Sequence, residues 1–175
     1  MTKFFSYSIG FFIIILQTSV IPYFFYSFHF FDISIPFILY LSLRHPFTEG
    51  LFVVIFLGFF TDSFSSGPFG IYETTYLWFF ICTRWAARFF HTDTYLLLSI
   101  IIFSGILLEN IIFFGTSLML GQKIVFLMPS LYIILWQLCL AAVTGPLIFY
   151  VIDALQTVFE YRVKEIFEKW KQVSE

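Results

Sequence analysis

The side chains most often used for catalysis are scattered along this sequence instead of forming motifs. His29, His45 and His91 lie far apart, and no two histidines flank a glutamate at the spacing of a zinc-protease helix. Cys82 and Cys139 have no second cysteine three residues away, which favours buried thiols over a disulfide or metal site. No glycine-rich phosphate loop is present. These absences predict a protein that is not an enzyme and has neither a metal nor another cofactor.

One acid stands well inside an apolar stretch. Glu109 is followed by Asn110, and Gln137 lies at comparable depth in the last apolar stretch. A carboxyl group at such depth costs about 2.5–3.5 kcal/mol on insertion scales unless it is neutral, paired or facing a cavity. Glu109 could line a ligand or proton site. Alternatively, it forms a polar contact with Gln137 or with a helix of a partner protein.

The densest group of turn residues separates two apolar runs. It reads Gly58-Phe-Phe-Thr-Asp62-Ser-Phe-Ser-Ser-Gly67-Pro68-Phe-Gly70. Gly58 allows another helix to approach closely. Gly67, Pro68 and Gly70 predict a tight turn, because glycine accepts positive φ and proline fixes φ. With Asp62 and no base, this compact segment is the best candidate site, although an ordinary outer loop has a similar pattern.

The chain that carries these residues is mostly apolar. Hydrophobic residues make up 60% of its 175 residues and charged residues only 11%, and the mean hydropathy is +0.93. A soluble domain has about 25% charged residues. The sequence therefore predicts an all-α polytopic membrane protein with lipid around most of its surface. The first apolar run is longer than a signal-peptide core and lacks a cleavage site, so we expect it to remain as a span.

Six spans are expected from the apolar runs. Four runs approach or exceed the roughly 20 residues that a spanning helix needs: 4–26, 71–90, 95–120 and 124–152. The runs 30–43 and 47–61 are shorter, and at about 1.5 Å per residue each covers some 20 Å of a roughly 30 Å hydrocarbon core. They are either two short spans in a thinned or protein-shielded region, or a re-entrant hairpin. In both cases the chain returns to the side of the membrane from which it started, so the orientation of the other spans is the same.

The basic residues set the orientation. With the N-terminus in the cytoplasm, eight of the nine are cytoplasmic and only Lys123 lies outside. The eight are Lys3, Arg44, Arg84, Arg88, Arg162, Lys164, Lys169 and Lys171. Arg44 and the i, i+4 pair of Arg84 and Arg88 each mark an inner turn, where such side chains usually reach lipid phosphates. Both termini are therefore expected in the cytoplasm.

The last segment, 153–175, mixes charged and apolar residues. Its apolar positions follow helical spacing: Phe159, Val163, Ile166, Phe167 and Trp170. Either the last span simply continues into water, or the tail is an amphipathic helix on the inner leaflet or against a cytoplasmic partner. Upstream, Gly145-Pro146 predicts a kink in the last span.

Around the turn, the sequence resembles the rod shape-determining protein MreD family. That family has a Gly-(Leu/Phe)-x-x-Asp stretch, a Ser/Gly-rich turn and a Pro-x-Gly, which 58–62 and 66–70 match in order and spacing. Upstream residues are also similar, namely Pro36, the run ending at Tyr40, Arg44-His45-Pro46 and Gly50. The resemblance is specific over about residues 33–78 and elsewhere rests on length and topology. The chain uses Phe heavily where members of the family more often have Leu.

The resemblance implies a non-enzymatic inner-membrane subunit of the bacterial cell-elongation machinery. Its implied partners are MreC, a bitopic protein with a periplasmic domain, and the MreB filament, the glycosyltransferase RodA and a class B penicillin-binding transpeptidase. Membrane lipids are expected around it and no nucleic acid. The residues expected in this role are Gly58, Asp62, Gly67, Pro68 and Gly70 at the outer turn, Arg44, Arg84 and Arg88 at the inner surface, and Glu109 within the membrane.

The family's fold is similar to the S-components of energy-coupling-factor vitamin transporters. This similarity implies six short helices around a potential central cavity. It also provides the alternative function, an S-component-like carrier that captures a small molecule such as a vitamin, which Glu109 and Gln137 would suit. Against it, such components dock through Ala-x-x-x-Ala in the first span, whereas this first span has only Ser6-x-x-x-Gly10.

Overall fold

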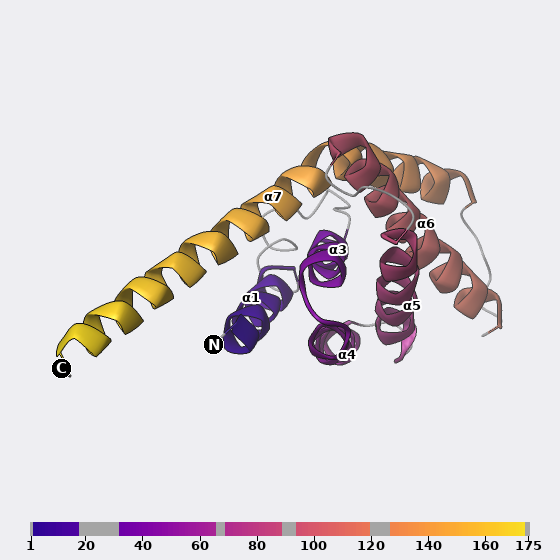
Figure 1. The fold of residues 1–175 in the computed structure, drawn as a ribbon. Helices are drawn as coiled ribbons and strands as arrows, with labels where there is room; N and C mark the ends of the chain where they lie inside the picture. Colours follow the sequence, from indigo (N-terminus) through magenta and orange to yellow (C-terminus); the bar gives the residue numbers. More distant parts are fainter. Residues whose placement is uncertain (1, 18–31, 66–68, 89–93, 120–126, 174–175) are drawn as a thin grey trace.

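The computed structural model describes residues 2–17, 32–65, 69–88, 94–119 and 127–173, which are helical almost throughout (Figure 1). Their six helices are α1 (Thr2–Ile15), α3 (Ser34–Arg44), α4 (Phe47–Phe64), α5 (Ile71–Ala86), α6 (Tyr95–Met119) and α7 (Leu127–Val173). No strand occurs within these ranges. The expected all-α class is therefore confirmed for the described residues.

Three of the described helices contain segments long and apolar enough to cross a membrane. These segments are Phe47–Phe64, Tyr95–Thr116 and Ile134–Phe159. Each of them exposes large apolar side chains, for example Phe52, Ile111 and Leu147. A protein surrounded by water would bury many of these side chains, whereas lipid covers them without cost. Length and surface together indicate a helical membrane protein.

The short helix α3 occupies the centre of the bundle. It packs against α1, α4, α5, α6 and α7 (Figure 1). Nine of its eleven residues are buried, and Ile35, Phe37 and Leu41 are completely covered. Because protein surrounds it on every side, α3 does not have to match the thickness of the bilayer. This burial favours the protein-shielded alternative for the short apolar run 30–43.

Contacts between helices fix their directions. At Gly10 of α1, Leu57 of α4 and Phe37 of α3 lie at one level, and Gly50 of α4 lies beside Leu41 of α3. Thus α3 runs antiparallel to α4, to which the two residues His45 and Pro46 join it. We call the two ends of the bundle the Asp62 end, where α4 finishes, and the Arg44 end, where α3 finishes.

The start of α1 and the second half of α7 both lie at the Arg44 end of the bundle. Gln17, just after α1, accepts a hydrogen bond from the Ser34 hydroxyl at the start of α3, so α1 begins at the opposite, Arg44 end. Asp153 in the second half of α7 pairs with Arg44 itself. The start of α1 and the second half of α7 therefore lie on one side of the bundle.

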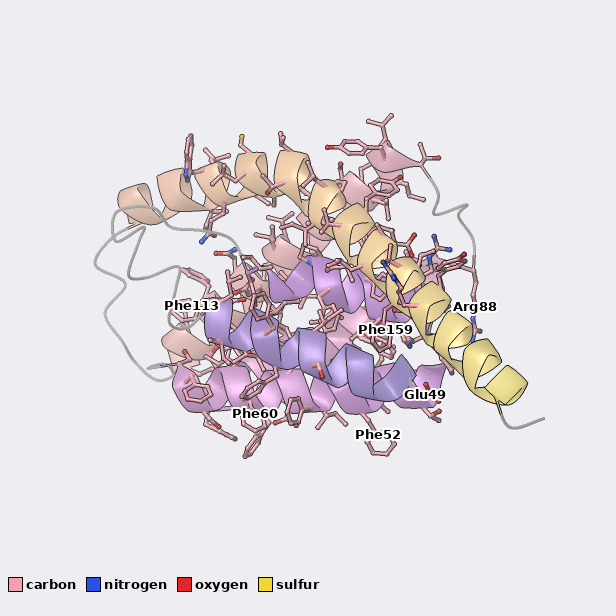
Figure 2. The ribbon with its side chains drawn as sticks, turned by 90° about the vertical axis from the view of Figure 1, so that its left-hand side faces the viewer. Glu49, Phe52, Phe60, Arg88, Phe113 and Phe159 are labelled. Atoms are coloured by element: carbon pink, nitrogen blue, oxygen red, sulfur yellow. The ribbon has the colours of Figure 1, made fainter. Side chains whose placement is uncertain are left out.

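The helix α7 combines the last expected span and the expected tail. It runs from Leu127 to Val173 without a break at Asp153, where the tail was expected to begin. No glycine or proline interrupts residues 147–173, so the helix can continue. Pro146 lies inside α7, and Figure 2 shows the helix bending between its two halves. Residues 18–26 of the first expected span, and the interval 120–126, lie outside the described residues.

Candidate functional site

The joint between α4 and α5 contains the described part of the turn motif. The Asp62 side chain is only 3% exposed. Its Oδ1 accepts the backbone N–H of Tyr72 at 3.1 Å, and its Oδ2 accepts that of Glu73 at 3.0 Å. These N–H groups belong to the first turn of α5, where they have no partner within their own helix. Asp62 therefore caps a neighbouring helix, and its negative charge also faces the positive end of the α5 dipole.

Two glycines make this capping contact possible. A Cβ atom on Gly58 would lie 2.6 Å from the Glu73 Cα, so only glycine lets α4 approach the start of α5 this closely. Gly70, just before α5, has a φ of 98°, which is strained for residues with a side chain. Gly58, Asp62 and Gly70 thus act together as one structural joint. Gly67 and Pro68, also expected at this site, lie outside the described residues.

A buried acid begins the central helix. Asp32 is 6% exposed, and its Oδ1 accepts the Ser34 backbone N–H at 2.8 Å. The completely buried Tyr76 of α5 donates its hydroxyl hydrogen to Asp32 Oδ2. The Ser34 hydroxyl donates to Gln17 Oε1 at 3.2 Å. These contacts cap α3 and connect its start to α1 and α5.

Glu109 of α6 adds a second acid to this region. Its carboxyl group is close enough to that of Asp32 for the two to interact electrostatically, and both act on the hydroxyls of Tyr72 and Tyr76. The sequence suggested a contact between Glu109 and Gln137, and the structure adds Asp32 as an acid that interacts with Glu109. Two carboxyl groups that interact away from water are stabilised by a shared proton, a cation or donors from a ligand. Asp32, which is buried, and Glu109, which is half-buried, are therefore the part of the site best suited to bind a polar ligand.

At the opposite end of α3, the capping side chain is an arginine instead of an acid. The Nη1 atom of Arg84, on α5, donates to the Ser42 carbonyl at 3.1 Å and to the His45 carbonyl at 2.7 Å. Its guanidinium also lies 5.8 Å from the centre of the Phe47 ring. The last carbonyl groups of a helix lack partners within the helix, and a cation there opposes the dipole. Arg84 thus caps the C-terminal end of α3.

The second half of α7 is attached to the same end of α3. Arg44 binds Asp153 in a fork, with Nε 3.0 Å from Oδ1 and Nη2 3.3 Å from Oδ2. Gln156 Oε1 accepts the Tyr40 hydroxyl and lies 3.2 Å from His45 Nε2. We call these contacts of Asp153 and Gln156 the α7 latch. Arg88 is exposed and, like Glu49, lies toward this end of the bundle (Figure 2).

No family model, curated protein or solved structure matches this chain. What the protein does must therefore be inferred from its own residues and their geometry. Among the described residues, no group of three or more His, Cys, Asp or Glu is placed to hold a metal ion.

The structure divides the expected site residues between two ends of the bundle. Gly58, Asp62 and Gly70 come together at one end, and Arg44 and Arg84 lie at the other, both in contact with α3 or its C-terminal turn. Four further residues take part in polar contacts that sequence reasoning missed: Asp32, Tyr76, Asp153 and Gln156. Asp32 had a signal, because an acid within an expected span is costly and needs a reason. Tyr76, Asp153 and Gln156 have no such signal, because their partners become neighbours only in the folded protein.

Proposed function

We propose that this protein is a non-enzymatic, multi-pass subunit of the bacterial cell-elongation machinery in the cytoplasmic membrane, of the MreD kind. Its function would be to hold MreC by helix-to-helix contact and so to support rod-shaped peptidoglycan synthesis. The observation that carries the proposal is the joint of Gly58, Asp62 and Gly70. The residues that resemble the MreD family most specifically are also those on which the packing of α4 against α5 depends.

The charged side chains described above hold helices together, as a scaffold requires. Asp62 and Arg84 satisfy backbone groups at helix ends, and Arg44 connects α7 to α3. Such contacts hold helices at fixed positions, which a protein needs if its outer surface is to bind another helix in lipid. With the Arg44 end in the cytoplasm, as the distribution of basic residues favours, the joint faces the periplasm, where the folded domain of MreC lies.

Depletion of the protein in its own rod-shaped host tests the proposal at the level of the cell. Loss of a scaffold of the elongation machinery leaves wall growth undirected, so the cells should become round. A plasmid copy should restore rods, and a copy carrying Gly58→Ala should restore them poorly. Cells that keep their rod shape after clean depletion would overturn the proposal.

Photo-crosslinking from the lipid-facing surface tests the partner directly. A photoreactive amino acid replaces one exposed residue on each outer helix in turn: Phe12, Phe59, Trp78, Ile111 or Leu147. One face should crosslink to MreC in living cells, and the other four serve as matched controls because they are similarly apolar and exposed. The absence of an MreC adduct from any face would contradict helix-to-helix binding in the bilayer.

One observation favours a second candidate, an S-component-like carrier of a small molecule. Asp32 accepts the hydroxyl hydrogen of the buried Tyr76 and interacts electrostatically with Glu109, and such a group suits a polar ligand. Native mass spectrometry of the purified protein would detect a bound metabolite near unit stoichiometry. Loss of that species in Glu109→Gln, with the protein still folded, would support the carrier. A wild-type protein that purifies without any ligand would exclude it.

A further inference from the structure

The second half of α7, residues 147–173, extends beyond the other described helices. We call this segment the C-terminal arm. In Figure 1, α3 and α4 are seen nearly along their axes, whereas the arm runs across the view and ends far from the bundle. The arm is therefore oblique to α4, whose residues Phe47–Phe64 are long and apolar enough to span. Relative to α4, an arm with this direction, starting at the Arg44 end, turns toward the plane of the membrane surface.

The first part of the arm has two apolar sides. One side packs on the bundle through Phe149 and Ile152, which are buried. The other side exposes large apolar side chains at helical spacing, namely Leu147, Val151, Leu155 and Val158. Farther upstream, α7 exposes Leu135 and Val143 in the same way, within or next to the segment apolar enough to span. The exposed apolar surface of the arm is thus continuous with the surface that lipid covers.

The distal part of the arm has only one apolar side. The positions Phe159, Val163, Ile166 and Trp170 follow Ile152 at helical spacing, and charged residues occupy most of the other positions from 160 to 171. Because α7 is one helix to Val173, this side continues the one on which Ile152 packs. A change from two apolar sides to one is expected where a helix leaves hydrocarbon for the interface between lipid and water.

The α7 latch fixes the position at which the arm leaves the bundle. Asp153 and Gln156 hold it against Arg44, Tyr40 and His45 at the end of α3. The bend at Pro146 comes just before these contacts, so the direction of the arm is set by a proline on one side and the latch on the other.

We propose that the distal part of the C-terminal arm, residues 159–173, lies along the lipid surface at the Arg44 end of the protein, steered there by the α7 latch. The occupant of its distal apolar side is the lipid of that leaflet, into which the apolar positions dip while the lysines and glutamates stay in water. This role is separate from the binding of MreC and does not depend on it.

Spin labels on single cysteines test the proposal in the full-length protein. Cys82 and Cys139 are first replaced by serine, and labels are placed one at a time from 158 to 172 in nanodiscs of phosphatidylethanolamine and phosphatidylglycerol. Accessibility to oxygen, which concentrates in lipid, should peak at 159, 163, 166 and 170. Accessibility to a water-soluble nickel chelate should peak at the positions between them. Uniform access of nickel would show that the arm projects into water and would overturn the proposal.

Two further measurements separate the alternatives. In Asp153→Ala/Gln156→Ala, the contrast between oxygen and nickel should fall at least twofold, whereas the neighbouring Thr157→Ala should leave it unchanged; an unchanged contrast in the double variant would exclude steering by the latch. The same single-cysteine variants are labelled with a water-soluble maleimide in nanodiscs and in cells. If cysteines on the distal apolar side react in nanodiscs but are protected in cells, a protein partner covers that side and the proposed contact with lipid is wrong.

Discussion

At the two ends of the bundle, charged side chains of opposite sign cap helix ends. At the Asp62 end, a carboxylate from α4 accepts the first N–H groups of α5. At the Arg44 end, the guanidinium of Arg84 on α5 donates to carbonyl groups at the finish of α3. In both cases the charge comes from a different helix and opposes the dipole of the helix that it caps. Water cannot satisfy helix ends that are covered by protein or lipid, so a neighbouring side chain does so.

The ends differ in how much of their structure is exposed. Asp62 is nearly inaccessible and lies against a glycine contact that tolerates no added atom. The ion pair between Arg44 and Asp153 is open, with side chains 49% and 31% exposed. The Asp62 end is therefore held by packing and buried hydrogen bonds, whereas part of the Arg44 end depends on an ion pair that solvent screens. Substitutions should lower the free energy of unfolding most at the Asp62 end and least at this exposed ion pair.

The largest effect is expected from Gly58→Ala. The new Cβ would lie 2.6 Å from the Glu73 Cα, so two backbones must separate, and overpacking of this kind costs about 3 kcal/mol. Reversible unfolding in mixed micelles measures the loss of unfolding free energy. Gly115→Ala is the matched control, because a Cβ there meets open space on α6. Equal stability of the two variants would contradict the close approach of α4 and α5.

Asp62→Ala should destabilise the protein by about 2 kcal/mol. The substitution leaves the N–H groups of Tyr72 and Glu73 without their acceptor in a buried place. Asp62→Asn keeps one acceptor oxygen and should lose about half as much. The same unfolding measurement applies, with Ser63→Ala as control, since the Ser63 hydroxyl bonds only to the Phe59 carbonyl of its own helix. If alanine and asparagine behave alike, the capping explanation is wrong.

Arg84→Met tests the opposite cap and should cost about 1.5 kcal/mol. Methionine keeps much of the apolar length but leaves the carbonyls of Ser42 and His45 without this donor. Arg84→Lys should recover part of the loss, because an ammonium does not reproduce the planar guanidinium. Hydrogen exchange in the last turn of α3 should rise along with the loss of stability. Arg88→Met, at an exposed position, is the control and should change neither quantity.

The smallest effect is expected for the exposed ion pair. Arg44→Ala and Asp153→Ala should each cost about 0.5 kcal/mol, since solvent screens the pair even though its geometry is bidentate. A double-mutant cycle measures the coupling between them, which should shrink further at high salt. A coupling as large as the cost of Asp62→Ala would remove the difference between the two ends.

The sequence predicts the elements of this fold better than their contacts. Apolar runs and turn residues locate the helices, because length and glycine or proline act locally. Capping by Asp62 depends on α5 returning beside α4, and the pairing of Arg44 with Asp153 joins residues far apart in the chain. Neither follows from spacing.

The central place of α3 could not be predicted from its composition. Lipid and protein interiors are both apolar, so an apolar helix looks the same whichever of them surrounds it. Its short length was one hint that protein covers it. The acid Asp32 was a second hint, since an isolated carboxyl group near lipid is unfavourable, and Tyr76 proves to be its partner.

The position of α3 has a consequence for how the protein is made. During synthesis, its eleven residues leave the ribosome before α5, α6 and α7 exist. Alone, α3 would reach only about 16 Å into the hydrocarbon, with Asp32 and its last carbonyls lacking Tyr76 and Arg84. We therefore expect α3 to enter the membrane as a hairpin with α4, or to stay near the surface until α5 has been made. Insertion strictly one helix at a time would leave both ends of α3 without these partners.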